Sequence, residues 1–299
     1  MLAIIIANFV TTRDHLLRAT DDRLQSIVNN NASSISEWVT NKKAMVASLA
    51  LVADVESPLP FVNAILIKGQ FGDAYIGYAN KKMIITHDLL PEGFDPTTRP
   101  WFIQALQAAD TITTAPYIDE FTKKLVITIA QSAILKNDEH AVAAADIQLD
   151  AVIATVNAIK PTPHSFAFLI NGKGDILTHP KAALRLKSVS EIASTLSLQK
   201  LQEIDRSQRS IDVHLDGRDG MLMAQKIDGT DWILVVALDR AEALETLDVM
   251  LSTSAVVTLL IVLLAVLLLT VLISRMLKYL ALVRDAMQDT ASGKGDLTK

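Results

Sequence analysis

The sequence contains no cysteine. This absence excludes a disulfide scaffold, a thiol nucleophile and a cysteine-ligated metal centre. Basic residues are also in the minority, because 28 Lys and Arg against 33 Asp and Glu give a net charge of −5. The chain therefore offers no basic surface for a phosphate backbone, and a nucleic-acid-binding protein is not expected.

The motifs of common enzymes and metalloproteins are missing as well. The GKGD stretches at 172–175 and 293–296 lack the spacing of a phosphate-binding loop. No Gly-x-Ser-x-Gly is present, and the six histidines include no pair at the spacing of metal ligands on a helix. We therefore expect no catalytic residues, no cofactor and no bound metal.

Much of the apolar content lies in one segment. The mean hydropathy of the chain is +0.31, and residues 249–274 contain no charged residue. This run exceeds the roughly 20 residues that a transmembrane helix needs. Basic residues outnumber acidic ones in residues 275–299, which places that end in the cytoplasm.

The N-terminal residues 1–12 are apolar and uncharged. As a helix they would span only about 18 Å, so they are predicted to be the outer end of a first transmembrane helix; the start of an ordinary buried helix is the alternative. Two spans would place residues 13–248 outside the cytoplasm as a folded domain.

Helical periodicity continues through residues 13–50, which contain neither proline nor glycine. The apolar positions recur four to seven residues apart, at Leu17, Leu24, Val28, Ile35, Val39 and Met45. A long helix is predicted, with an apolar stripe that faces either its own domain or a twin helix in a homodimer.

The rest of the outer region is predicted to be α+β, as two modules in tandem. Residues 51–150 contain the strand-like runs AYIGYA, MIITHDL, KLVITIAQSAIL and HAVAAADIQL, interrupted by the helical stretch PWFIQALQAA. Residues 151–248 begin with a helix near 151–159 and continue with a hairpin, SFAFLINGKGDILTHP, and three more strands. Both sheets are predicted to be antiparallel and half buried.

One loop and helix start, FDPTTRPWFIQAL, contains the most informative residues. Pro100 suits the first position of a helix, which places Arg99 at the helix entrance, where the dipole and the free amides favour an anion. A guanidinium matches a carboxylate in geometry. Trp101 adds an apolar wall and an N–H donor.

Carboxylates and a tyrosine complete a dipolar set. Tyr117 and Asp119 are two residues apart, so on a strand they would share one face. Asp146 lies within an otherwise apolar strand, where a carboxylate is costly unless a cation or several donors meet it. Together with Arg99 and Trp101 they suit a zwitterion, although a structural salt bridge and a core tryptophan would fit the same residues.

These features together resemble the double Cache sensor domain of bacterial methyl-accepting chemotaxis receptors, over nearly all of residues 13–248. The resemblance implies two PAS-like modules: a membrane-distal, ligand-binding one in residues 51–150 and a membrane-proximal one in 151–248.

In amino-acid-binding members the arginine and tryptophan hold the ligand carboxylate, while the tyrosine and aspartates hold its ammonium. Phe94 and Phe102 stand where those members usually have tyrosines. The ligand-binding residues implied are Arg99, Trp101, Tyr117, Asp119, Asp146, Phe94, Phe102 and Tyr78.

The tail supports the same family, because residues 283–299, which end in GKGDLTK, resemble the start of a HAMP domain. A proline usual near the HAMP start is replaced here by KYLAL. The resemblance implies a homodimer in the bacterial inner membrane with a periplasmic sensor for amino acids, taurine-like zwitterions or amines. It would signal to a chemotaxis histidine kinase and coupling protein.

Several alternatives stay open. The same sensor could take polyamines or carboxylates, or be attached to a histidine kinase or a cyclic-dinucleotide enzyme. A structural or adhesive membrane protein remains the third possibility.

Overall fold

A computed structural model describes residues 2–87 and 90–291 of the chain. Residues Thr11–Ala243 form one compact unit. The described residues of Met1–Val10 and Leu244–Lys299 form another.

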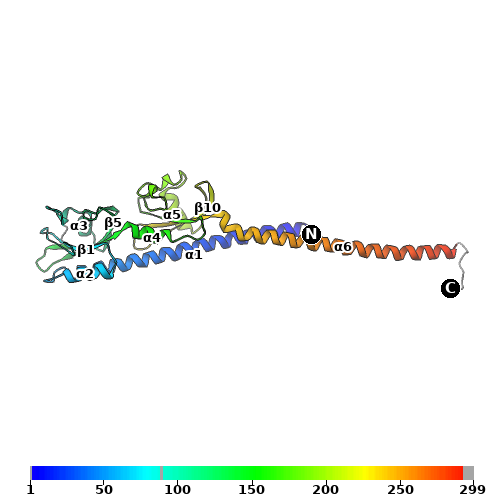
Figure 1. The fold of residues 1–299 in the computed structure, drawn as a ribbon, viewed down its shortest axis with the longest axis horizontal. Coiled ribbons are helices and arrows are strands. Elements are labelled where there is room, and N and C mark those ends of the chain that lie inside the picture. Colours follow the sequence, from blue (N-terminus) through cyan, green and yellow to red (C-terminus); the bar gives the residue numbers. More distant parts are fainter. Residues whose placement is uncertain (1, 88–89, 292–299) are drawn as a thin grey trace. The chain divides into compact units, whose positions relative to one another are not determined.

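Helix α1 (Leu2–Ala50) contributes its residues from Thr11 onward to the larger unit, where it packs along both modules (Figure 1). Its buried apolar side chains follow the three- and four-residue spacing of one helix face, and they belong to one core that contains strands of both sheets. These side chains include Leu24, Val28, Ile35, Val39 and Val46. The predicted long helix is confirmed, and this part of its apolar stripe faces its own domain.

The first module, residues 59–148, is a six-stranded antiparallel sheet with two helices. The strand order is β2-β1-β6-β5-β3, and β4 also pairs with β5. The elements are α2 (Leu59–Lys68), β1 (Asp73–Tyr78), β2 (Met83–Ile85), the 3-10 turn η1 (Pro96–Thr98), α3 (Pro100–Gln107), β3 (Ile112–Thr113), β4 (Tyr117–Ile118), β5 (Leu125–Ile134) and β6 (His140–Gln148). Helix α2 was not anticipated from the sequence.

The central strands of this sheet are buried on both faces. Ala74 and Ile76 lie in the core that includes α1, whereas Tyr75 packs on the other face with Trp101 and Phe102 of α3. All six residues of β1 are buried. The prediction of half-buried strands was therefore wrong for β1 and for most of β6, because helices cover both faces.

The second module, residues 166–239, follows the connecting helix α4 (Leu149–Asn157). Its five-stranded sheet has the order β8-β7-β11-β10-β9, and the predicted hairpin turn is present, with the N–H of Gly174 donating to the carbonyl of Asn171 at 3.0 Å. The elements are β7 (Phe166–Ile170), β8 (Ile176–Thr178), η2 (Ala182–Leu184), η3 (Val189–Glu191), α5 (Leu198–Ser207), β9 (Ile211–Leu215), β10 (Arg218–Lys226) and β11 (Ile233–Asp239).

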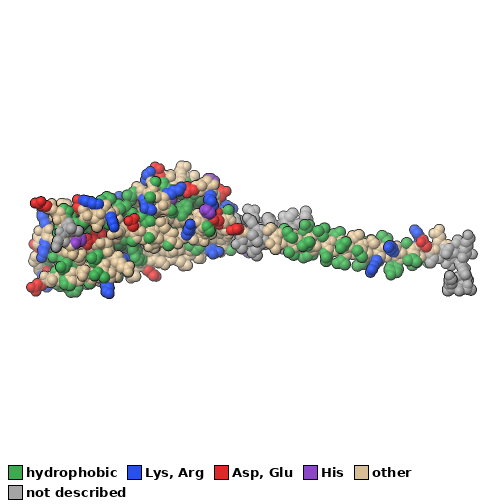
Figure 2. Space-filling view, in the orientation of Figure 1, with side chains coloured by type: hydrophobic (Ala, Val, Ile, Leu, Met, Phe, Trp, Pro, Cys, Tyr) green, Lys and Arg blue, Asp and Glu red, His purple; other side chains and the backbone are tan. Residues whose placement is uncertain are grey.

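Helix α6 (Arg240–Ala291) contains, among the described residues, the single candidate for a membrane span. The most apolar 18-residue window of this stretch, Ala255–Asp285, has a mean hydropathy of 3.4, and Figure 2 shows a largely apolar surface along the stretch. It overlaps the span predicted at 249–274 but extends further. A second span was expected at 1–12 and is not found among the described residues. The GKGDLT stretch at 293–298 lies outside them.

Candidate ligand-binding site

Three polar residues lie side by side across the middle strands of the first module. Asp73 of β1 is opposite Asp146 of β6, and Asp146 is opposite Thr128 of β5. Directly opposed residues of an antiparallel sheet point to the same face. Tyr75, two residues beyond Asp73, shares this face, which α3 covers.

Asp146 is the centre of this group. Its Oδ1 accepts hydrogen bonds from the Tyr75 hydroxyl at 2.9 Å and from the Thr128 hydroxyl at 2.5 Å, while Tyr117 and Thr128 share a hydrogen bond of 2.6 Å. The other oxygen, Oδ2, is buried and has no hydrogen-bond partner among the described residues. Burial raises the pKa of Asp146 to about 7, against the opposing effect of the two hydroxyl donors.

Two further carboxylates add negative charge near Asp146. Asp73 accepts from the Ala74 N–H at 2.8 Å and meets His87 Nε2 at 2.6 Å, and burial raises its pKa. Asp119 accepts from the backbone N–H and the hydroxyl of Thr122, both at 2.6 Å. Both carboxylates raise the pKa of Asp146 through charge repulsion.

Aromatic rings cover the same face of the sheet. The Trp101 ring lies 4.9 Å from the Tyr75 ring and 5.6 Å from the Phe102 ring, measured between centroids. Trp101 packs directly over Gly77, where an added Cβ would be 2.6 Å from the indole. A side chain at position 77 would therefore displace Trp101.

Arg99 lies at the edge of the group, as the N-cap residue of α3. Its guanidinium is 3.6 Å from a carboxylate oxygen of Glu120 and 5.8 Å from the centroid of Phe94. Phe94 in turn contacts Phe121, which packs edge-on against His87. Because the ion pair is long and partly exposed, it is weak enough to be exchanged for another carboxylate.

The structure brings most of the predicted residues together but separates one. The residues near Asp146 are Trp101, Tyr117 and Asp119, and Phe102 packs against Trp101. Arg99 lies at the edge, where it contacts Glu120 and Phe94. Tyr78 lies on the opposite face of β1, where its hydroxyl donates to the carbonyl of Ala53 at 2.8 Å.

Two details were not anticipated from the sequence. Asp119 follows β4 rather than lying on it, because β4 ends at Ile118 and the carboxylate closes the turn. The additional residues of the site are Asp73, Tyr75 and Thr128. Alternation along AYIGYA places Tyr75 and Tyr78 on opposite faces, and this signal could have favoured Tyr75.

Two matched substitutions distinguish these tyrosines. We expect Tyr75→Phe to weaken ligand binding about 10–100-fold, because it removes a hydrogen bond to a carboxylate that is worth about 1.5–3 kcal/mol when the carboxylate is ionised. Tyr78→Phe should leave affinity unchanged and lower the free energy of unfolding by about 1 kcal/mol. Titration calorimetry of both variants measures the affinity, and thermal melts measure the stability. An equal loss of ligand affinity in the two variants would contradict the assignment of the tyrosines to opposite faces.

The class of protein that the fold and the site define is a chain of two tandem α+β modules on one long helix, with a buried acidic and aromatic cluster in the first module. The chain belongs to the Cache domain family: a family model of that description, dCache_1, matches residues 11–247.

Curated relatives and solved structures agree with this membership. The chain is 30% identical over 277 residues to the methyl-accepting chemotaxis protein McpG of Pseudomonas putida, a match that covers 91% of this chain and 40% of that protein. It is 30% identical over 304 residues to PctB of Pseudomonas aeruginosa, also a methyl-accepting chemotaxis protein, covering 97% of this chain and 47% of that one. The chain thus spans less than half the length of these relatives.

A solved structure supports the fold. The ligand-binding domain of the Pseudomonas fluorescens chemoreceptor CtaA, in complex with L-isoleucine, matches with a TM-score of 0.66 and 25% identity. The match covers 79% of this chain and 99% of that domain.

Proposed function

We propose that this chain is the sensory part of a transmembrane chemoreceptor that binds an amino acid or a related zwitterion in the first module. The relatives are methyl-accepting chemotaxis proteins, and the CtaA domain is solved with L-isoleucine and with L-serine. The proposal is a binding function rather than an enzymatic one.

The buried Oδ2 of Asp146 is the observation that supports this function most directly. A buried carboxylate oxygen without a donor is unfavourable, and a ligand ammonium would supply both the missing donor and the opposite charge. Asp73 and Asp119 would add further attraction for a cation, and Tyr75 and Trp101 would cover its apolar part. This half of the site is therefore assigned to the ammonium group.

Arg99 is assigned to the ligand carboxylate. It lies at the entrance of α3, and its present partner Glu120 is 3.6 Å away. Phe94 and Phe102 contribute no hydroxyl, so selectivity for the acid group would rest mainly on this guanidinium.

Amines are the second candidate ligands. The site contains three carboxylates, Asp73, Asp119 and Asp146, whereas Arg99 is a cation at its edge. An amine without a carboxylate would satisfy Asp146 equally well. The two candidates differ only in whether Arg99 takes part.

The test compares amino acids with the amines that result from their decarboxylation, by titration calorimetry on the whole chain in lipid nanodiscs. We expect the parent to prefer the amino acids, and Arg99→Ala to weaken their binding about 10–100-fold, as expected for loss of a charge-assisted bidentate contact. Amine affinity should stay unchanged.

Lys123→Ala is the matched control, because Lys123 also pairs with Glu120 but lies on the exposed side of the turn. If Arg99→Ala binds amino acids as the parent does, the carboxylate assignment is wrong. If amines alone bind, the second candidate is correct.

The chemotaxis-protein relatives support a proposal for assembly and signalling. The sensor would lie in the periplasm of a bacterium, as a homodimer, and α6 would cross the inner membrane into a HAMP domain. A chemotaxis histidine kinase and a coupling protein would receive the signal beyond the residues of this chain. A ligand would change signalling through unequal affinity for two conformations.

A further inference from the structure

The second module has a cavity of its own, with a volume of about 400 Å³. It lies between the start of β7, the loop after β8 and the turn after β9, and its lining includes Phe166, His179, Lys181 and Asp216. Its volume is within the usual range of small-molecule sites.

One residue of the cavity lining, Phe166, has the position in the second sheet that Asp73 has in the first. Both sheets have the same order of neighbouring strands. Asp73 and Asp146 are the first pair of β1 and β6, and Phe166 and Ala237 are the corresponding pair of β7 and β11. This strand pair is therefore apolar where the first module has two carboxylates, which disfavours an ammonium group beside it.

His179 provides an unused hydrogen-bond donor beside the cavity. The side chain is 2% exposed and packs against the rings of Phe166 and Phe168, at centroid distances of 5.3 and 5.6 Å. Its Nδ1 accepts from the N–H of Lys181 at 3.0 Å, so the ring proton lies on Nε2. Nε2 is buried and has no partner among the described residues. Burial lowers the pKa of His179 to about 4, which keeps the ring neutral.

The charged side chains at the rim favour an anion. Lys160 and Lys181 both line the cavity, and Asp216, which pairs with Lys181, is the one carboxylate among the described residues of the lining. We propose that this cavity binds a small monocarboxylate with an apolar body. One carboxylate oxygen accepts the Nε2–H of His179, the lysines balance its charge, and the apolar part packs on Phe166. This site is separate from the proposed amino-acid site, and its ligand is an anion rather than a zwitterion.

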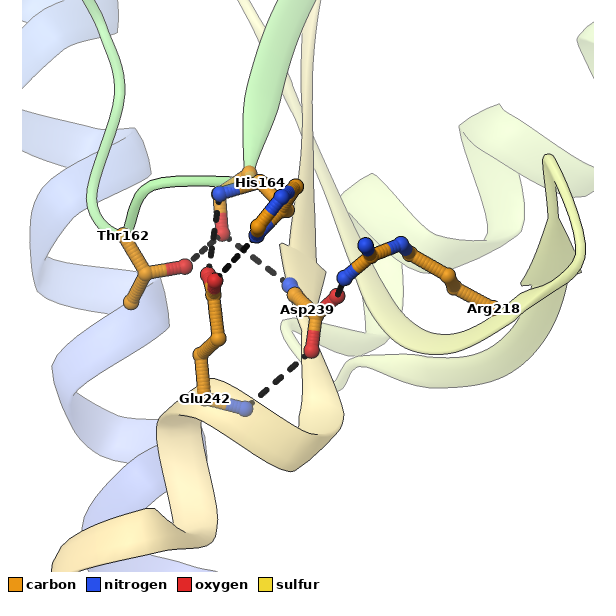
Figure 3. Close-up of polar contacts among 6 residues, drawn as sticks. Thr162, His164, Arg218, Asp239 and Glu242 are labelled. Atoms are coloured by element: carbon orange, nitrogen blue, oxygen red, sulfur yellow. Dashed lines mark hydrogen bonds and ion pairs between the residues drawn. The ribbon is translucent and has the colours of Figure 1, made fainter.

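A ligand in this cavity would contact the residues that hold the start of α6. His164 and Ser165 line the cavity. The N–H of His164 donates to Glu242 at 2.9 Å, and the His164 ring also bonds Glu242 (Figure 3). The Asp239 N–H donates to the Ser165 hydroxyl at 3.0 Å, and Asp239 Oδ1 accepts from the backbone N–H of Glu242 at 3.1 Å. The residues that line this cavity are thus joined by hydrogen bonds to the first turn of α6.

The experiment uses benzoate as the probe and the whole chain in lipid nanodiscs. Calorimetry follows binding, and a ¹H–¹⁵N spectrum of labelled histidine follows the Nε2–H of His179. We expect saturable binding of one benzoate, a shift of that resonance, and at least about tenfold weaker binding of benzamide, which has the same shape but no charge. His179→Leu should weaken benzoate binding at least about tenfold.

Three further variants make the result decisive. His214→Leu applies the same substitution to an exposed histidine outside the cavity lining and should leave affinity unchanged. Lys181→Met alters an exposed side chain, so it tests the site even if His179→Leu does not fold; it should weaken binding about threefold or more. Asp146→Asn should have no effect on benzoate. The proposal is overturned by equal binding of benzamide, by no saturable benzoate binding, or by benzoate binding that Asp146→Asn abolishes.

Discussion

Asp146→Asn is expected to abolish amino-acid binding in the first module and to stabilise the ligand-free domain. The asparagine removes the charge that would pair with an ammonium group, and its amide hydrogens would face that group in place of Oδ2. Loss of one partner from a buried ion pair costs about 3 kcal/mol or more, which corresponds to at least about 100-fold in affinity.

The gain in stability follows from the pKa of Asp146. Because the pKa rises from 3.8 to about 7 on folding, the folded state favours the neutral carboxyl. The ionised form therefore destabilises the domain above pH 7, by about 4 kcal/mol for three pKa units, and this penalty fades as the pH falls from 7 to 4. Asparagine is neutral throughout and can still accept the bonds from Tyr75 and Thr128.

The measurement is a thermal melt of parent and variant at pH 8 and at pH 4, with calorimetry at pH 8. We expect the melting temperature of the variant to be several degrees higher at pH 8, and the two proteins to converge at pH 4. Asp150→Asn, at an exposed aspartate in the first turn of α4, is the control for a simple change of charge. A variant that is less stable at pH 8, or that binds normally, would show that Asp146 has a structural role.

The long helix and the hairpin could be predicted because their signals are local. An unbroken apolar repeat defines α1, and Gly174, with a φ of +88°, closes the turn that GKGD predicts. Helices α2 and α5 were missed. The first is apolar without a clear polar face, and the second has only two fully buried residues, Leu201 and Ile204.

The site was harder to predict because it depends on strand register. Arg99, Trp101 and Asp146 are unusual in their local context, and that context was enough to propose them as site residues. Asp73 and Thr128 enter the site only because they lie opposite Asp146, and a one-residue shift in pairing would move them to the other face. No local pattern in the sequence fixes that register.

Ligand binding below pH 7 is expected to release a proton. An ammonium group pairs only with the ionised form of Asp146, whereas the ligand-free carboxyl has a pKa of about 7. At pH 6 about 0.9 proton would leave per ligand bound, and at pH 8 about 0.1. Affinity should therefore be about tenfold weaker at pH 6 than at pH 8, because part of the binding free energy is used to remove the proton.

Calorimetry at pH 6 in two buffers of different ionisation enthalpy measures the released proton directly. Tyr75 and Tyr117 do not contribute, since burial and the nearby Asp146 hold the pKa of each hydroxyl above its usual range. Asp73, whose pKa is also raised and which meets His87, is the competing source. Asp73→Asn should therefore retain the release if Asp146 is responsible. Equal heats in the two buffers would mean that Asp146 is already ionised at pH 6, and the unpaired Oδ2 would then have a donor in the ligand-free protein.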